Sequence, residues 1–599
     1  MKIPDSLKLE EFIYSSDGRY IAYHKNENII LFDLKSNKEV KSIKYNNYID
    51  FNVFTFSKDN KSLLISISEY QNYLKKDYYK LDIETSTKFI KITQNENKKL
   101  INNGKELLSI DGDYSYKVGR YSINLWDNKN NKNLLDIVAF DDNEWLSITS
   151  EGYFNSSAKA PKYLNVLTTP MDVSSIDQYF ETFYRPDIMK LSLSDVKPSN
   201  FLAGQDKIVN TELKIVKKKV HKIKKVKKII VIPTLKLSDV KPAPQVAIID
   251  TKTSIKKEEL KVTLRITPSS GGIGQIRLYL DGVLIKTDGD RGLKKKQNKN
   301  IVLKTYTIKL PKGKHTLKAI VYNEANTMAS REDTLAVTST YNPIVKPNIY
   351  AVIVGINEYK NPTIALKYAV ADAKLFAKTI KKRTKGLYGD VNIKLLISKE
   401  QTSKEHITKT LKNLENISSN DLFIFFVASH GMIEDAKYHM ITSNVGALSS
   451  RGIKREAIGQ NALRDMIANI PTTKKFIILD TCNSGALGQA IEVALLTRGL
   501  TETTAMKVLS RAVGSTIISA SSSSQEALEG YKGHGLLTYV LTDGLNGKAD
   551  SDRDGYIKTL EIANFVEDMV PEIAEREFKR AQYPFISPLG QGFPLVKVK

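Results

Sequence analysis

DLFIFFVASHG, from Asp421 to Gly431, and KKFIILDTCNSG, from Lys474 to Gly485, decide the fold of the C-terminal part of the chain. Each contains an uninterrupted apolar run, which is typical of a parallel strand covered on both faces. Segments with helical apolar spacing alternate with such runs, and Thr402 with Glu405 three residues later predicts a capping box that opens one helix. Residues 346–599 are therefore predicted to form an α/β domain with a mostly parallel central sheet.

Polar side chains follow both apolar runs at the point where each strand should end. Neighbouring parallel strands end at the same edge of a sheet, where such sheets bind ligands. This predicts that His430 lies close to Asp480 and to Cys482, the one cysteine of the chain. An imidazole can accept a thiol proton and so create a thiolate nucleophile. The backbone N–H groups of Gly431 and Cys482 are candidates for an oxyanion hole.

Three motifs resemble the caspase family, most nearly its bacterial metacaspase-like branch. In chain order they are SHG, DTCNSG and SASSSSQEALEGYKGHGLLTYVLTDGL. The resemblance covers roughly residues 348–599. It implies a cysteine endopeptidase in which His430 is the general base and Cys482 the nucleophile. It also implies an acyl-enzyme intermediate that water hydrolyses.

The same resemblance implies that Asp480 and Asp372 line a pocket for the substrate residue before the cut. Paired carboxylates there would select Arg or Lys, by bidentate or point-charge pairing. Metacaspases commonly carry Ser-Gly before the histidine, where this chain has Ala428 and Ser429. Two alternatives stay open: Asp480 as a cap on the turn that follows it, and His534 as a rival base.

A second motif lies beyond the central sheet. DSDRDGYIKTLE fits D-x-D-x-D-G-x5-E, the spacing with which a calcium loop surrounds the ion with oxygens. The predicted ligands are carboxylates of Asp550, Asp552, Asp554 and Glu561 and the carbonyl of Tyr556. The alternative is an Asp-Gly turn without metal, and no other cofactor is expected.

Residues 1–190 are predicted to form an all-β, propeller-like region that resembles WD-repeats. Turn pairs begin at Asp17, Asp59 and Asn103, which are 42 and 44 residues apart, as propeller blades are. Trp126-Asp127 resembles the dipeptide that names the repeat. Three blades do not close a propeller of four to eight, so further blades are degenerate, missing or supplied by a partner chain. This region is expected to sense a signal or bind a protein partner.

Two segments separate these regions. Residues 191–243 are predicted to be a Lys-rich linker, with 9 lysines in the 15 residues 214–228. The run lacks interleaved aromatic and arginine residues, so a solvated linker is favoured over a nucleic-acid-binding segment. Residues 244–341 alternate short strands with Gly, Asp and Pro turns, which predicts an immunoglobulin-like β-sandwich.

Composition sets the remaining limits. The chain has 599 residues, 41% hydrophobic and 26% charged, with a formal net charge of +24, which indicates several packed domains. It contains no apolar run long enough to span a membrane and no leader pattern, so a cytoplasmic protein without membrane contact is expected. One cysteine excludes an internal disulfide. The expected partner is a protein or peptide substrate, and the alternative function is a catalytically silent caspase-fold scaffold or assembly protein.

Overall fold

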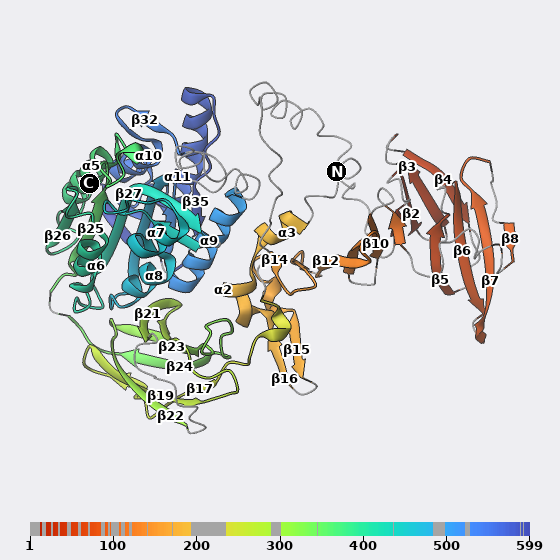
Figure 1. Cartoon of the computed structure of the whole chain (residues 1–599), viewed down its shortest axis with the longest axis horizontal. Helices are drawn as coiled ribbons and strands as arrows, with labels where there is room; N and C mark the ends of the chain where they lie inside the picture. Colours follow the sequence, from red (N-terminus) through yellow and green to blue (C-terminus); the bar gives the residue numbers. More distant parts are fainter. Residues whose placement is uncertain are drawn as a thin grey trace. The chain divides into compact units, whose positions relative to one another are not determined.

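A computed structural model of the chain contains two compact units (Figure 1). The first comprises Met1–Ser150 with Leu191–Ile230, and the second Glu151–Lys190 with Val231–Lys599. Most of the predicted linker, including the lysine run, lies outside the residues that the structure describes. The described residues are 12–14, 19–25, 28–33, 36, 38–44, 50–57, 61–69, 72–85, 90–93, 96, 107–109, 114–118, 122–140, 142–169, 172–192, 235–288, 301–343, 345–434, 437–482, 498–520, 527–587, 589–590 and 592–598.

The first unit is built from antiparallel sheets whose neighbouring strands follow one another in the chain, one sheet for each sequence repeat. Buried residues of the first and second sheets, such as Leu31 and Leu63, share one core. The N-terminal region is thus rich in β structure, and a propeller stays a prediction. The strands are β1 (Phe12–Tyr14), β2 (Tyr20–Lys25), β3 (Asn28–Asp33) and β4 (Lys38–Lys44); β5 (Asp50–Phe56), β6 (Ser62–Glu69), β7 (Asn72–Asp82) and β8 (Ile90–Ile92); and β9 (Leu107–Ser109), β10 (Tyr114–Val118), β11 (Ser122–Asp127), β12 (Lys132–Ala139) and β13 (Trp145–Ile148).

The second unit begins with short elements and then forms two β-sheets around one core. Alternate residues of both sheets, such as Val262 and Leu278, meet in that core. The immunoglobulin-like topology stays a prediction. The short elements are β14 (Phe154–Ser156), β15 (Asn165–Thr169), β16 (Asp172–Ser175), α2 (Phe180–Phe183) and α3 (Pro186–Ser192); the sheets are β17 (Gln245–Ile249), β19 (Glu259–Thr267) and β22 (Val302–Lys309), and β18 (Ser254–Ile255), β24 (Asp333–Ser339), β23 (Gly313–Val321), β20 (Ile276–Leu280) and β21 (Val283–Asp288).

The C-terminal part of the second unit has the predicted mostly parallel sheet. Its order is β26-β25-β27-β30-β31-β35, in which only β35 pairs antiparallel. The continuous apolar runs form β27 and β30, because both faces of these strands are covered. The strands are β25 (Ile349–Gly355), β26 (Val391–Leu396), β27 (Leu422–Glu434), β30 (Lys474–Cys482), β31 (Thr516–Ser519) and β35 (Phe585–Ser587), with β28 (Lys437–Met440), β29 (Ile458–Gly459), β32 (Glu529–Tyr531), β33 (His534–Gly535), β34 (Tyr556–Lys558) and β36 (Pro594–Lys597) outside this path.

Helices cover both faces of the sheet. Phe376 of α5, Val540 of α10 and Val566 of α11 belong to the core on one face, while α6, α8 and α9 bury apolar residues on the other. The capping prediction was one residue early: Ser403 is the N-cap of α6 and accepts from His406 N–H at 3.4 Å. The helices are α5 (Ala369–Arg383), α6 (Lys404–Lys412), α7 (Ser450–Glu456), α8 (Gln460–Ala468), α9 (Arg498–Val513), α10 (Leu536–Asp543) and α11 (Thr559–Ile573). None of the helices described is both long and apolar enough to cross a bilayer.

A buried ion cluster joins three parts of the second unit. Arg277 of β20 is 1% exposed and pairs with Glu181 of α2, and Arg464 of α8 lies 3.6 Å from the same carboxylate. Although burial opposes ionisation, the Arg277 guanidinium lowers the pKa of Glu181 to about 2. Residues 151–190 are thereby held against both the two β-sheets and the α/β domain.

Candidate active site

The parallel register of β27 and β30 brings the predicted nucleophile and base to adjacent positions. His430 on β27 is directly opposite Cys482 on β30, and Ala428 is opposite Asp480. His430 and Cys482 are the last pair in the parallel register of the two strands, so they lie at the edge of the sheet where the sequence predicts the chemistry. His430 itself is 2% exposed.

The His430 ring has a defined orientation. Its Nε2 lies 2.8 Å from the carbonyl oxygen of Ile364, in the loop between β25 and α5. A carbonyl only accepts hydrogen bonds, so Nε2 carries the hydrogen in the neutral ring and Nδ1 is left as the basic nitrogen. The imidazole can therefore accept a proton at Nδ1 while Ile364 holds its other side.

Gly431 is required by close packing beside the base. A Cβ at this position would lie 2.9 Å from Thr481 Oγ1 and 2.9 Å from Tyr438 Cε2. The side chains of Thr481 and Tyr438 thus pack directly against the Cα of Gly431. The oxyanion hole formed by the N–H groups of Gly431 and Cys482 stays a prediction.

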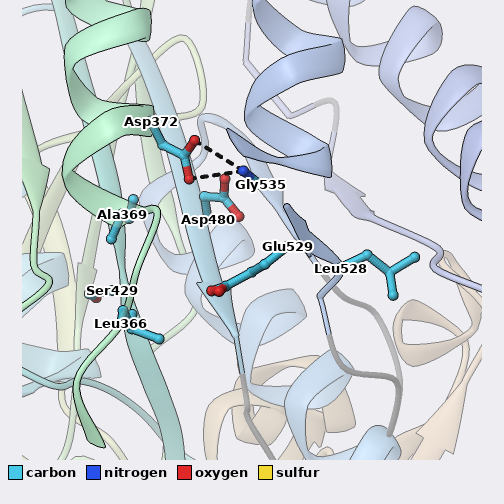
Figure 2. Close-up of a pocket in the computed structure, with 9 residues that line it drawn as sticks. Leu366, Ala369, Asp372, Ser429, Asp480, Leu528, Glu529 and Gly535 are labelled. Atoms are coloured by element: carbon cyan, nitrogen blue, oxygen red, sulfur yellow. Dashed lines mark hydrogen bonds between the residues drawn. The ribbon is translucent and has the colours of Figure 1, made fainter. Parts of the chain in front are cut away.

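Three carboxylates converge on a pocket beside these strand ends (Figure 2). Asp372 comes from α5, Asp480 from β30 and Glu529 from β32. Sequence reasoning missed Glu529, whose only signal was its place in the third family-like motif. The complete lining is Leu366, Ala369, Asp372, Ala428, Ser429, Asp480, Leu528, Glu529 and Gly535.

The first turn of α10 and the residues before it hold two of these carboxylates. The Gly535 N–H donates to both Asp372 oxygens, at 3.0 and 3.2 Å, and the Thr538 hydroxyl donates to Asp480 Oδ2. A Cβ on Gly535 would lie 3.0 Å from Asp372 Oδ2 and 3.3 Å from Asp480 Oδ2, so both carboxylates face one point. His534 Nδ1 lies 3.0 Å from Asp372 Oδ1, which places this histidine at the pocket.

The negative charge of the pocket is not balanced by a Lys or Arg side chain of the described residues. Burial raises the pKa of Asp372, and the charge of Asp480 raises it further. Burial likewise raises the pKa of Asp480; the Thr538 hydrogen bond opposes this shift, and the charge of Glu529 adds to it. Within the described residues, neither Asp372 nor Asp480 is paired with a Lys or Arg side chain. A cation entering the pocket would remove this repulsion.

The calcium-loop motif forms a compact turn between α10 and α11. Carboxylate oxygens of Asp550, Asp552 and Glu561 lie within 4.8 Å of one another, and Gly555 has the positive φ of +83° that such a turn needs. Asp550 Oδ1 is buried and has no hydrogen-bond partner among the described residues, so it is an oxygen that a cation could bind. Lys558 Nζ donates to Asp552 at 2.7 Å, so an internal cation neutralises part of the loop.

Lys558 also donates to Asp554, the third acidic residue of the motif. The side chains of Asp552 and Asp554 are half-exposed, so both can exchange the ammonium for another cation. The hydrogen bond from Lys558 lowers the pKa of Asp552 and keeps its carboxylate ionised. The Asp552 carboxylate is thus in the charge state that calcium requires.

Comparison with known proteins agrees with this geometry. Residues 349–590 match the family model of the caspase domain, Peptidase_C14. The match supports a caspase-family assignment for this part of the chain, and with it a cysteine peptidase acting on protein substrates. No curated protein matches the chain closely enough to count as a relative.

Three solved structures show a limited likeness to this chain. The fibronectin(III)-like modules of CbhA from Clostridium thermocellum are 22% identical, with 16% of this chain and 100% of that chain covered at a TM-score of 0.14. A CARDB domain from Pyrococcus furiosus is 18% identical, covering 17% and 96% at 0.13. A eukaryotic initiation factor is 10% identical, covering 56% and 78% at 0.13. TM-scores this low support no conclusion about this protein.

Proposed function

We propose that the chain is a cysteine endopeptidase that cleaves proteins after Arg or Lys. The observation that carries the proposal is the pair of buried carboxylates, Asp372 and Asp480, neither of which is paired with a Lys or Arg side chain among the described residues. They line a pocket that also contains Ser429, the neighbour of His430. A substrate side chain in that pocket would therefore bring the following peptide bond to the ends of β27 and β30.

His430 and Cys482 would perform the reaction in two halves. Nδ1 of His430 accepts the thiol proton, and the thiolate attacks the carbonyl carbon to form a C–S bond. The resulting oxyanion is stabilised by backbone N–H groups, for which Gly431 and Cys482 are the candidates. The imidazolium then protonates the leaving amine as the C–N bond breaks, which leaves an acyl-enzyme. Water, deprotonated by His430, hydrolyses the thioester and restores the thiol.

Charge explains the proposed preference for basic residues. A guanidinium can donate to two carboxylates at once, while an ammonium acts as a point charge between them. A substrate aspartate would add a further negative charge beside Asp372, Asp480 and Glu529, so it is disfavoured. Arg is expected to be preferred over Lys because the two carboxylates face one point and suit a planar fork.

Reporter peptides ending in Arg, Lys or Asp test the proposal. We expect wild-type protein to release the Arg and Lys reporters and to leave the Asp reporter intact, while C482A and H430A release none. Wild-type and C482A protein that are equally inert toward all three would favour the alternative function, a catalytically silent scaffold. Equal cleavage of Arg and Asp reporters would disprove the role of the pocket.

The other parts of the chain receive supporting roles in this proposal. We assign the β-rich first unit to sensing or to binding a protein partner. We place the protein in the cytoplasm, where a reactive thiol stays reduced. Neither the role of the first unit nor the location of the protein changes the chemistry proposed for the pocket.

We further propose that the loop from Asp550 to Glu561 binds calcium. Bound calcium would supply positive charge that ties the loop to the start of α11. The buried Asp550 Oδ1, which has no hydrogen-bond partner in the described part of the chain, supports this proposal. Ca²⁺ in the millimolar range should raise the melting temperature of the wild-type protein but not that of D552A/D554A, and equal responses of the two proteins would reject it.

A further inference from the structure

The backbone of His430 lies where the central sheet loses a strand. β25 ends at Gly355, which pairs with Ala428, whereas β27 continues to Glu434. The Ala428 carbonyl still accepts from Ile356 N–H at 3.0 Å, but the strand supplies no carbonyl for the next N–H group on that edge, which is that of His430. A buried N–H group without an acceptor destabilises the folded state.

Tyr359 supplies the acceptor. The His430 N–H donates to the Tyr359 hydroxyl at 3.0 Å, and Tyr359 is 3% exposed. The two rings also pack together, with centroids 5.3 Å apart and planes tilted by 39°. The hydroxyl therefore takes the place of a strand carbonyl, and the phenol ring lies against the imidazole.

One loop thus holds the base at two points. Tyr359 bonds the backbone of His430, and five residues later the Ile364 carbonyl lies 2.8 Å from Nε2 of the ring. Both contacts come from the segment between β25 and α5. A shift of the backbone at His430 would therefore move Nδ1 relative to Cys482 on the neighbouring strand, because the register places these residues side by side.

We propose that Tyr359 is a positioning residue for the general base: its hydroxyl fixes the backbone of His430 so that the imidazole can deprotonate Cys482. This inference rests on the proposed function. Tyr359 does not line the acidic pocket. Its loss should therefore affect the chemical step and leave recognition of the Arg side chain intact. A misplacement of about 1 Å in such a pair costs roughly 100-fold in rate.

The variant Y359F removes the hydroxyl and keeps the ring. With an Arg reporter we expect kcat to fall about 10- to 100-fold with little change in KM. A matched control is Y388F, because the Tyr388 hydroxyl is also buried and donates to the Pro594 carbonyl instead of to the site. Y388F should match Y359F in the loss of melting temperature and retain wild-type kcat.

The single cysteine allows a test that needs no substrate. Iodoacetamide reacts with the thiolate, so its rate of alkylation against pH reports Cys482 alone. Wild-type and Y388F protein should be alkylated rapidly well below pH 8, whereas the curves for Y359F and H430A should move toward that of a free thiol.

The controls separate two kinds of failure. A wild-type curve for Y359F, with a shifted curve for H430A, would overturn the role of Tyr359 alone. A wild-type curve for H430A would overturn the Cys–His pairing, and with it the proposed function. Equal kcat losses in Y359F and Y388F would show a merely structural role for the hydroxyl.

Discussion

In the proposed function Asp480 recognises the basic side chain of the substrate, and its burial lowers the stability of the free protein. Its pKa is raised in the folded state, so the protonated form is the one that folding favours. Stability from this group is present at low pH and lost as pH rises from the ordinary carboxyl range through the raised pKa. Binding of a substrate cation has the opposite dependence, since it needs the ionised form. Among the residues that the structure describes, Asp372, Glu529 and His534 are the other titratable groups at this pocket.

The variant D480N tests this trade-off. At pH 8 it should raise the melting temperature by about 2–4 °C, because it removes one buried charge worth on the order of 1 kcal/mol. It should also lower kcat/KM for the Arg reporter at least about tenfold, because a buried charge partner of the substrate is lost. At pH 4 the stability difference should vanish.

A matched control is D465N. Asp465 lies 2.8 Å from Arg464 and accepts from Gln275 at 3.0 Å, away from the pocket. D465N should therefore lower the melting temperature and leave kcat/KM unchanged. Destabilisation by D480N at pH 8 would contradict the account of the pocket charge.

At the scale of elements, helix α10 prepares the pocket. Gly535 precedes the helix and binds Asp372, while Thr538 in its first turn binds Asp480. Positive backbone charge at a helix N-terminus favours carboxylates nearby. The same helix carries Thr542 one turn later, whose hydroxyl donates to the carbonyls of Thr538 and Tyr539 at 2.9 and 3.0 Å.

The pair T538V and T542V separates the pocket from the helix. In T538V, the ionised carboxylate of Asp480 loses the hydrogen bond from Thr538. The pKa of Asp480 should therefore rise further. We expect KM for the Arg reporter to rise several-fold at pH 7 and to approach the wild-type value at alkaline pH. T542V should keep the wild-type KM throughout. Identical pH profiles of KM for the two variants would exclude this role for Thr538.

Strands could be predicted because their apolar patterns depend on local sequence. Contacts between residues far apart in the chain could not be predicted. The apolar runs predicted β27 and β30, and the parallel arrangement followed. The partners of Lys475, at the start of the apolar run that forms β30, could not be predicted in this way. Its side chain is fully buried and donates to the carbonyls of Leu284 at 2.8 Å and Ile467 at 2.7 Å. Glu529 reaches the pocket from a distant strand, and no local pattern signals such a contact.

The N-cap of helix α6 shows that prediction from the sequence is limited even within a short segment. Thr402 and Ser403 both suit an N-cap by residue type. The Thr402 hydroxyl instead donates to the Ser398 carbonyl at 2.8 Å in the preceding turn, and Ser403 takes the cap. Turn geometry, which the sequence pattern did not specify, decided between them.

At the scale of the molecule, the α/β domain makes contacts beyond the residues 349–590 that match the family model. Arg464 is paired with Glu181 of the segment 151–190, and Lys475 is bonded to Leu284 of β21. Arg511 of α9 is paired with Asp177 in the same segment. Removing the residues before 346 would take one partner each from Arg464 and Lys475, which would keep Asp465 and the Ile467 carbonyl, and would separate Arg511 from Asp177. We therefore expect the isolated α/β domain to be less stable than the second unit.

Two truncations test this dependence. A fragment that starts at residue 151 should keep the cooperative melting transition of the second unit and the wild-type kcat/KM for the Arg reporter. A fragment that starts at residue 346 should melt at much lower temperature and be cut rapidly in limited proteolysis. Equal melting temperatures for the two fragments would contradict the account.

The most direct measurement is covalent capture of Cys482 by peptidyl ketone electrophiles that end in Arg or Asp, followed by peptide mass analysis. We expect the Arg probe to label Cys482 much faster than the Asp probe, D480N to reduce this preference, and C482A to remain unlabelled. Equal labelling rates for the two probes, or no labelling by the Arg probe under conditions in which iodoacetamide alkylates the thiol, would contradict it.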